Sequence, residues 1–173
     1  VSQVSYIALG AALLSPIATA GAIVHMVNQG FMKITLFFCA GLFAEELKLS
    51  KVSQLAGVGR RMPVTSAAFT IAALGMIGLP PFAGFISKWA LGLGGLDAGQ
   101  PWVIAVLLTS TVLNAAYFLP IIATIWTSPR SESEGSDEGT FPVPARRSGW
   151  EAPASLLLPA VATALFVILF GVA

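Results

Sequence analysis

The sequence contains little charge, a single cysteine and a single histidine. Only 10% of its 173 residues are Asp, Glu, Lys or Arg, whereas a soluble globular domain usually carries about 25%. One cysteine excludes an internal disulfide framework, and the apolar run around Cys39 favours a buried, inert thiol. A net charge of +1 gives no electrostatic reason to expect a nucleic-acid partner.

What the sequence does contain is apolar. Hydrophobic residues make up 56% of the chain, and the mean hydropathy is +0.85, so we expect an integral membrane protein. The first residues lack the basic region and the small-residue cleavage site of a signal peptide, and Val1 opens directly into apolar sequence. We therefore expect the chain to start inside a larger polypeptide.

The apolar segments predict an all-α fold, a polytopic bundle of transmembrane helices with about five crossings. A spanning helix needs ~20 residues. The expected helices cover residues 1–17, 22–46, 64–93 with a break at 79–82, 102–126 and 153–173. Short connections are expected at 18–21, where the residues are small, and at 94–101, which is rich in glycine. The first is short of a full span, and we interpret it as the remainder of a longer helix.

Charged residues concentrate in two loops, a basic loop at 47–63 and a flexible charged loop at 127–152. They hold seven of the nine Lys and Arg residues: Lys48, Lys51, Arg60, Arg61, Arg130, Arg146 and Arg147. Because cations favour the cytoplasmic side, both loops should lie there. This is possible only if residues 64–93 cross the membrane once, as one discontinuous helix. The chain would then begin on the cytoplasmic side and end on the other side.

The break lies in the stretch GLPPFAGFISKW, residues 78–89. Pro80 and Pro81 interrupt the helix because proline removes a backbone donor, and Gly84 follows them. Lys88 comes less than two turns later, beside Ser87. Ion sites in transporters often lie at such breaks. The alternative is a simple proline kink with Lys88 reaching the lipid headgroups. Further polar lining is expected from the next helix, at Thr109, Ser110, Thr111 and Asn114.

A second polar feature is the row His25, Gln29 and Lys33, with Asn28 beside it. A spacing of four residues places the row on one helix face, over a length of about 12 Å. Histidine titrates near neutral pH, and ionisable residues inside a membrane are usually functional. We therefore predict a proton relay of Lys88, Lys33 and His25. The alternative is that His25 caps a helix end near the interface while Lys33 snorkels or forms a structural pair.

Three stretches resemble one known family. GLPPFAGFISKW, HMVNQGFMKITLFFCAG and VSQVSYIALG are similar to the antiporter-like membrane subunits shared by Mrp-type cation/proton antiporters and respiratory complex I, and most similar to the Mrp D-type subunit. The resemblance implies an essential role for Lys88. It also implies that the chain corresponds to the last five helices of a larger subunit, whose first repeat lies upstream of Val1.

The resemblance has one departure. In the family, two histidines and a lysine commonly follow one another at four-residue spacing, and His25 and Lys33 match the first and the last of them. Gln29 stands where the second histidine is common. A glutamine can orient water but cannot carry a proton near neutral pH. The relay therefore needs either one imidazole only or a water molecule at this position.

These observations favour a proton-conducting subunit of a monovalent cation/proton antiporter in a prokaryotic plasma membrane. We expect no enzymatic activity, cofactor or metal of its own. The expected partners are other membrane subunits, the lipid bilayer, protons and Na⁺ or K⁺. The first alternative is a proton-pumping subunit of complex I or of a membrane-bound hydrogenase, and the second is a scaffold whose lysines never change protonation.

Overall fold

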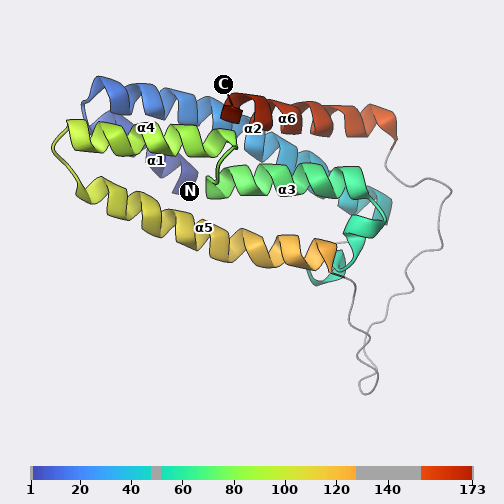
Figure 1. Cartoon of the computed structure of the whole chain (residues 1–173). Coiled ribbons are helices and arrows are strands. Elements are labelled where there is room, and N and C mark those ends of the chain that lie inside the picture. The colour runs from blue at the N-terminus through green and yellow to red at the C-terminus, as the bar shows by residue number, and fades with distance from the viewer. Residues whose placement is uncertain (1, 48–51, 128–152, 173) are drawn as a thin grey trace, which may run out of the picture.

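The computed structural model describes residues 2–47, 52–127 and 153–172, which form a bundle of helices (Figure 1). The elements are α1 (Ser2–Ala12), α2 (Pro16–Leu47), η1 (Val52–Leu55), η2 (Val58–Arg60), α3 (Pro63–Ile77), α4 (Ala83–Asp97), α5 (Trp102–Trp126) and α6 (Ala154–Val172). Within these ranges three helices are long and apolar enough to cross a membrane: α2, α5 and the part of α6 from Ser155 to Val172. The all-α fold class is confirmed, and the number of crossings stays a prediction.

The helices α3 and α4 follow one another in the same direction. Figure 1 shows α3 ending near the middle of the bundle, where α4 begins and continues toward the far end beside α2. The chain between them spans residues 78–82, which include the predicted break at 79–82. This arrangement is the one that a single discontinuous crossing requires.

Charged residues lie at both ends of the bundle. At one end α2 and α5 stop and α3 and α6 start (Figure 1); Glu45 and Glu46 lie in the last turn of α2, and Arg60 and Arg61 lie just before α3. At the other end Asp97 closes α4, and its carboxylate accepts a 2.6 Å hydrogen bond from Ser15. The remaining basic residues of both predicted loops, and residues 128–152 of the charged loop, lie outside the described residues.

The connection predicted at residues 18–21 is wrong. The chain turns between Ala12 and Pro16, where Leu14 has a φ of 51°, and α2 begins at Pro16 because proline suits the first helical turn. The small residues that suggested a loop are helical. They are small because α2 packs closely on α4: a side chain on Gly94 would meet Ala18, and one on Gly21 would meet Ala90.

The helix after the break is also longer than predicted. We expected it to end at Leu93, with a glycine-rich connector at 94–101, but α4 continues to Asp97. Gly94 and Gly95 are buried inside the helix, and a Cβ on Gly95 would stand 2.8 Å from the side chain of Val103. These two glycines serve helix packing, and only residues 98–101 connect α4 to α5.

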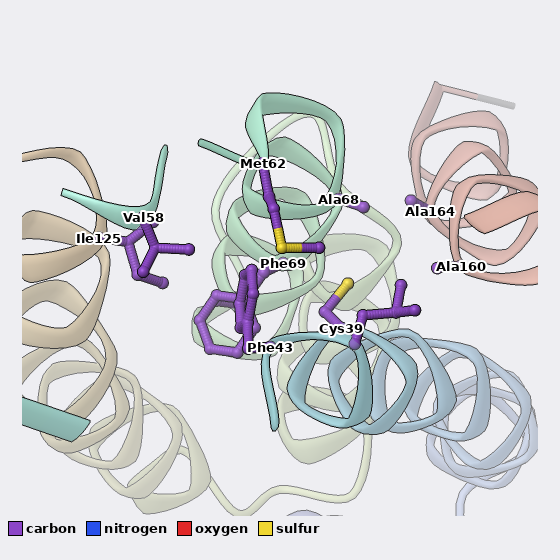
Figure 2. Packing of buried hydrophobic residues seen from close by; sticks show 11 residues of the cluster. Cys39, Phe43, Val58, Met62, Ala68, Phe69, Ile125, Ala160 and Ala164 are labelled. Carbon is purple, nitrogen blue, oxygen red and sulfur yellow. The ribbon is translucent and has the colours of Figure 1, made fainter. Parts of the chain in front are cut away.

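The largest apolar cluster joins four helices at the end of the bundle where α3 begins. Figure 2 shows Cys39 and Phe43 of α2 facing Phe69 of α3, with Ala160 of α6 on one side. Ile125 of α5 closes the cluster on the other side, and like Cys39 it is fully buried. The predicted burial of the cysteine is therefore confirmed.

The end of α6 packs against the break between α3 and α4. A Cβ built on Gly171 would collide with the carbonyl oxygen of Pro81 and the backbone of Phe82. Phe166 of α6 stacks on Phe31 of α2 with ring centroids 3.8 Å apart. The last helix thus covers one side of the interrupted backbone.

We predict that Gly84→Ala destabilises the bundle. An added Cβ would collide with the carbonyl oxygen of Gly75, and both residues are helical backbone that cannot move aside easily. Overpacking of this kind typically costs about 1–3 kcal/mol. Thermal unfolding of the purified protein in detergent measures the loss.

The matched control is Gly41→Ala, because a Cβ at Gly41 has no neighbour within 4 Å. Alanine is favoured over glycine in a helix by roughly 1 kcal/mol, so this variant should unfold at the same temperature or higher. Equal stability of both variants would contradict the close packing at Gly84.

Candidate functional site

The site begins with two backbone carbonyls that the prolines leave unpaired. In a continuous helix the carbonyls of Met76 and Ile77 would accept hydrogen bonds from residues 80 and 81. Pro80 and Pro81 have no N–H to donate, and α3 ends at Ile77, followed by Gly78 in the left-handed region with a φ of 91°. Both carbonyls therefore need another donor, because an unpaired polar group in a membrane costs several kcal/mol.

Lys88 supplies that donor from the second turn of α4. Its ammonium donates to the carbonyl of Ile77 at 2.7 Å and to that of Met76 at 3.3 Å. A third bond, of 3.4 Å, reaches the hydroxyl of Thr111 on α5. The side chain is only 7% exposed. The predicted lysine thus pairs the two carbonyls that the break leaves without donors. All three of its hydrogen-bond acceptors are neutral.

The ring of Tyr6 contacts both Lys88 and His25. The ammonium lies 5.2 Å from the centre of the ring, a cation–π distance. The same ring makes a T-shaped contact with the imidazole of His25, with centroids 5.1 Å apart and planes at 83°. The hydroxyl of Tyr6 donates to Ser110 on α5 at 2.5 Å. One aromatic side chain therefore contacts both titratable groups.

His25 is fully buried, and both its ring nitrogens have partners. Nδ1 lies 2.8 Å from the hydroxyl of Ser87, and Nε2 lies 3.1 Å from the side-chain oxygen of Gln3. Ser87 precedes Lys88 on α4, so the histidine is tied to the helix that carries the lysine. Asn28 makes a similar tie one turn further along α2, donating to the carbonyl of Ala83 at 2.9 Å.

The predicted row on α2 is only partly joined to this network. Gln29 is half-buried, and its side-chain oxygen is buried without a hydrogen-bond partner. Lys33 is half-buried as well, and no hydrogen bond between described residues links it to His25 or Lys88. Asn114 donates to the carbonyl of Ser110 in its own helix. A link from His25 to Lys33 therefore needs a bridging group.

Two residues of the site, Gln3 and Tyr6, were missed by the sequence analysis. Both lie on α1 and are buried, at 3% exposure each. Their signal was their spacing: polar residues at positions 3 and 6 share one face of a helix that is otherwise mostly apolar.

In the described part of the chain no group of three or more His, Cys, Asp or Glu residues could hold a metal ion.

The fold and the site together define an α-helical membrane protein in which a discontinuous helix buries a lysine on its own unpaired carbonyls. Residues 1–114 match the family described as NADH:quinone oxidoreductase/Mrp antiporter, TM. The chain belongs to this family, which confirms the predicted resemblance, and it is a multi-pass membrane protein. The matched range includes every residue of the site from Gln3 to Thr111.

The individual relatives with similar sequences are named as subunits of redox complexes. NADH-quinone oxidoreductase subunit N of Desulforudis audaxviator is 40% identical over 171 residues, covering 99% of this chain and 34% of the relative. F(420)H(2) dehydrogenase subunit N of Methanosarcina mazei is 28% identical, covering 74% of this chain and 28% of the relative. The chain therefore spans about a third of the length of the curated relatives it matches.

Solved structures show the same fold. A chain of the Mrp complex from Dietzia sp. DQ12-45-1b superposes with a TM-score of 0.80 at 27% identity, over 98% of this chain and 38% of that one. A chain of respiratory complex I from Thermus thermophilus superposes with a TM-score of 0.58 at 22% identity, over 98% and 42%. The second similarity concerns the fold alone.

We predict that Tyr6→Phe destabilises the protein while Tyr117→Phe does not. The first change removes the hydrogen bond to Ser110 but keeps the ring between Lys88 and His25. A loss of about 1 kcal/mol is expected, which lowers the melting temperature by roughly 2–4 °C in a chain of this size. Tyr117 is 66% exposed on α5 and serves as the matched control. Equal melting temperatures of the two variants would contradict the importance of this bond.

Proposed function

We propose that the chain is a proton-conducting membrane subunit in which Lys88 gains and releases a proton at the helix break. The observation that carries the proposal is the set of three neutral acceptors around the ammonium. A neutral amine keeps two N–H donors, so it can stay bonded to two of these acceptors after losing its proton. Both protonation states of Lys88 therefore have partners without any movement of the backbone.

In this proposal His25 and Lys33 extend the path along α2. His25 reaches the lysine helix through Ser87, whereas Lys33 is reached through water. The buried oxygen of Gln29, which lacks a partner in the structure, is a suitable place to hold such a water, because buried polar atoms are normally hydrogen-bonded. Water at Gln29 would serve where a second histidine is common in the family.

We further propose that the complex around this subunit is driven by redox chemistry, as the names of its sequence relatives suggest. The relative with 40% identity is a subunit of an NADH-quinone oxidoreductase, and another belongs to an F(420)H(2) dehydrogenase. Any electron transfer would take place in partner subunits. The second candidate is the Mrp-type antiporter preferred in the sequence analysis, which the superposition on the Mrp complex supports; Na⁺ or K⁺ would then be exchanged for protons.

The first test replaces the lysine. Lys88→Ala should abolish proton transport by the assembled complex in lipid vesicles, because neither alanine nor the remaining carbonyls can carry a proton. Transport is followed with a pH-sensitive dye inside the vesicles. Arg60→Ala is the matched control, since Arg60 is exposed at the end of the bundle; it should transport normally. Normal transport by Lys88→Ala would refute the proposed role.

Lys88→Arg separates proton transfer from a purely structural role. Arginine keeps a positive charge and several donors for the carbonyls but does not release its proton in a protein. A conducting lysine should fail as arginine, whereas the lysine of a non-titrating scaffold should tolerate the change. Full transport with an assembled Lys88→Arg complex would therefore favour the scaffold.

The two kinds of complex are distinguished by what copurifies with an affinity-tagged chain. A redox-driven complex should bring down subunits with iron–sulfur clusters or flavin, visible in the absorption spectrum. The antiporter should bring down small hydrophobic subunits only, and its vesicles should move protons in response to a Na⁺ or K⁺ gradient. The second result would overturn the redox assignment while leaving proton conduction intact.

A further inference from the structure

Gln3 connects the two titratable groups of the site. Its side-chain nitrogen donates to the carbonyl of Met76 at 3.4 Å, and its oxygen faces Nε2 of His25 at 3.1 Å. The carbonyl of Met76 also accepts the bond from Lys88. One amide on α1 therefore lies between the lysine's acceptor on α3 and the histidine on α2.

The orientation of this amide is set by the carbonyl of Met76. If the amide were reversed, two oxygen atoms would face one another at hydrogen-bond distance with no proton between them. A buried pair of that kind is costly, because both acceptors lose their bonds to water. The oxygen of Gln3 therefore points to His25, and Nε2 must carry a hydrogen to donate to it.

With Nε2 protonated, the remaining nitrogen of the imidazole is the one that can gain a proton. Nδ1 faces the hydroxyl of Ser87 at 2.8 Å, and the same hydroxyl lies 3.2 Å from the carbonyl of Gly84. When His25 is neutral, Ser87 donates to Nδ1. When His25 is charged, Nδ1 donates to Ser87, and the hydroxyl turns to the carbonyl of Gly84. Both states are fully hydrogen-bonded after one hydroxyl rotation.

We propose that Gln3 is a positioning residue that holds His25 in the Nε2–H tautomer, so that the imidazole exchanges its proton at Nδ1. That nitrogen faces α4, the helix of Lys88, instead of α1. The inference rests on the proposed proton conduction and adds the direction of exchange at His25 and the residue that fixes it. In the other tautomer, Nδ1 would carry a hydrogen toward Ser87, and Nε2 would be unprotonated toward Gln3.

The tautomer can be measured directly in the wild-type protein. His25 is the single histidine of the chain, so ¹⁵N-histidine labelling gives its two ring nitrogens, and solid-state NMR in lipid bilayers tells which one carries hydrogen. A His25→Gln sample identifies the signals if partner subunits contribute histidines of their own. We expect neutral His25 to be protonated at Nε2. If neutral wild-type His25 is protonated at Nδ1 instead, this measurement alone overturns the inference.

Substitutions of Gln3 test its role. Gln3→Met has a similar volume but no amide, so the Nδ1–H tautomer should become populated and proton transport should fall about tenfold, the effect of one hydrogen bond to a charged group. In its protonated form, Gln3→Glu donates its hydroxyl hydrogen to the carbonyl of Met76 and accepts from Nε2–H, so it should keep the Nε2–H tautomer. Thr163→Val is the matched control: it removes a hydroxyl whose hydrogen bonds among the described residues both lie within α6, and it should change neither readout.

The outcomes separate this inference from the proposed function. If Gln3→Met lowers the melting temperature but leaves the tautomer of His25 unchanged, Gln3 is merely structural and the inference is wrong. If Lys88→Ala transports protons normally, proton conduction through Lys88 is refuted, whereas the NMR result for His25 is still read independently.

Discussion

The structure depends on one constraint, the need to pair the carbonyls of Met76 and Ile77 inside a membrane. The two prolines remove the donors that would have paired them, and the ammonium of Lys88 replaces both with hydrogen bonds of 3.3 and 2.7 Å. A charged donor binds a carbonyl more strongly than a neutral one does. The two carbonyls thus hold the ammonium of Lys88 in place, and the ammonium stabilises the interrupted end of α3.

The surrounding helices follow from this pairing. For Lys88 to reach back to the end of α3, the first turn of α4 must approach α3 closely, and Gly84 packs directly on Gly75. Gly78 adopts the left-handed conformation that turns the chain out of α3. Asn28 then binds the carbonyl of Ala83, so α2 holds the start of α4 from the other side. Loss of one of these contacts would move the ammonium away from its acceptors.

The sequence predicted the elements that depend on local chemistry. The all-α class followed from the hydropathy, and Pro80 and Pro81 located the break because proline acts on its own backbone. The turn before α2 was misplaced, since small residues such as Ala18 and Gly21 suit both a loop and a close helix contact, and only the position of α4 decides between them. For the same reason Gly94 and Gly95 were assigned to a connector, although they lie inside α4.

The site was predicted in part for a similar reason. Lys88 and His25 stood out because ionisable groups are rare in apolar segments, and Ser87 was named because it adjoins the lysine. Gln3 and Tyr6 are ordinary polar residues in a short helix, and their importance comes from contacts to residues far away in sequence, such as Met76 and Ser110. Lys33 lay on the expected helix, but spacing along a helix does not say what faces it.

The contact of Gly171 with the break has a consequence for the order of synthesis. Helices emerge from the ribosome from the N-terminus onward, so the chain from α3 to α4 enters the membrane well before the end of α6 is made. Until then the backbone at Pro81 and Phe82 lacks the helix that covers it. A growing chain therefore passes through a stage in which the backbone at Pro81 and Phe82 is uncovered on one side, and a neighbouring helix or the insertion machinery has to shield it until α6 is in place.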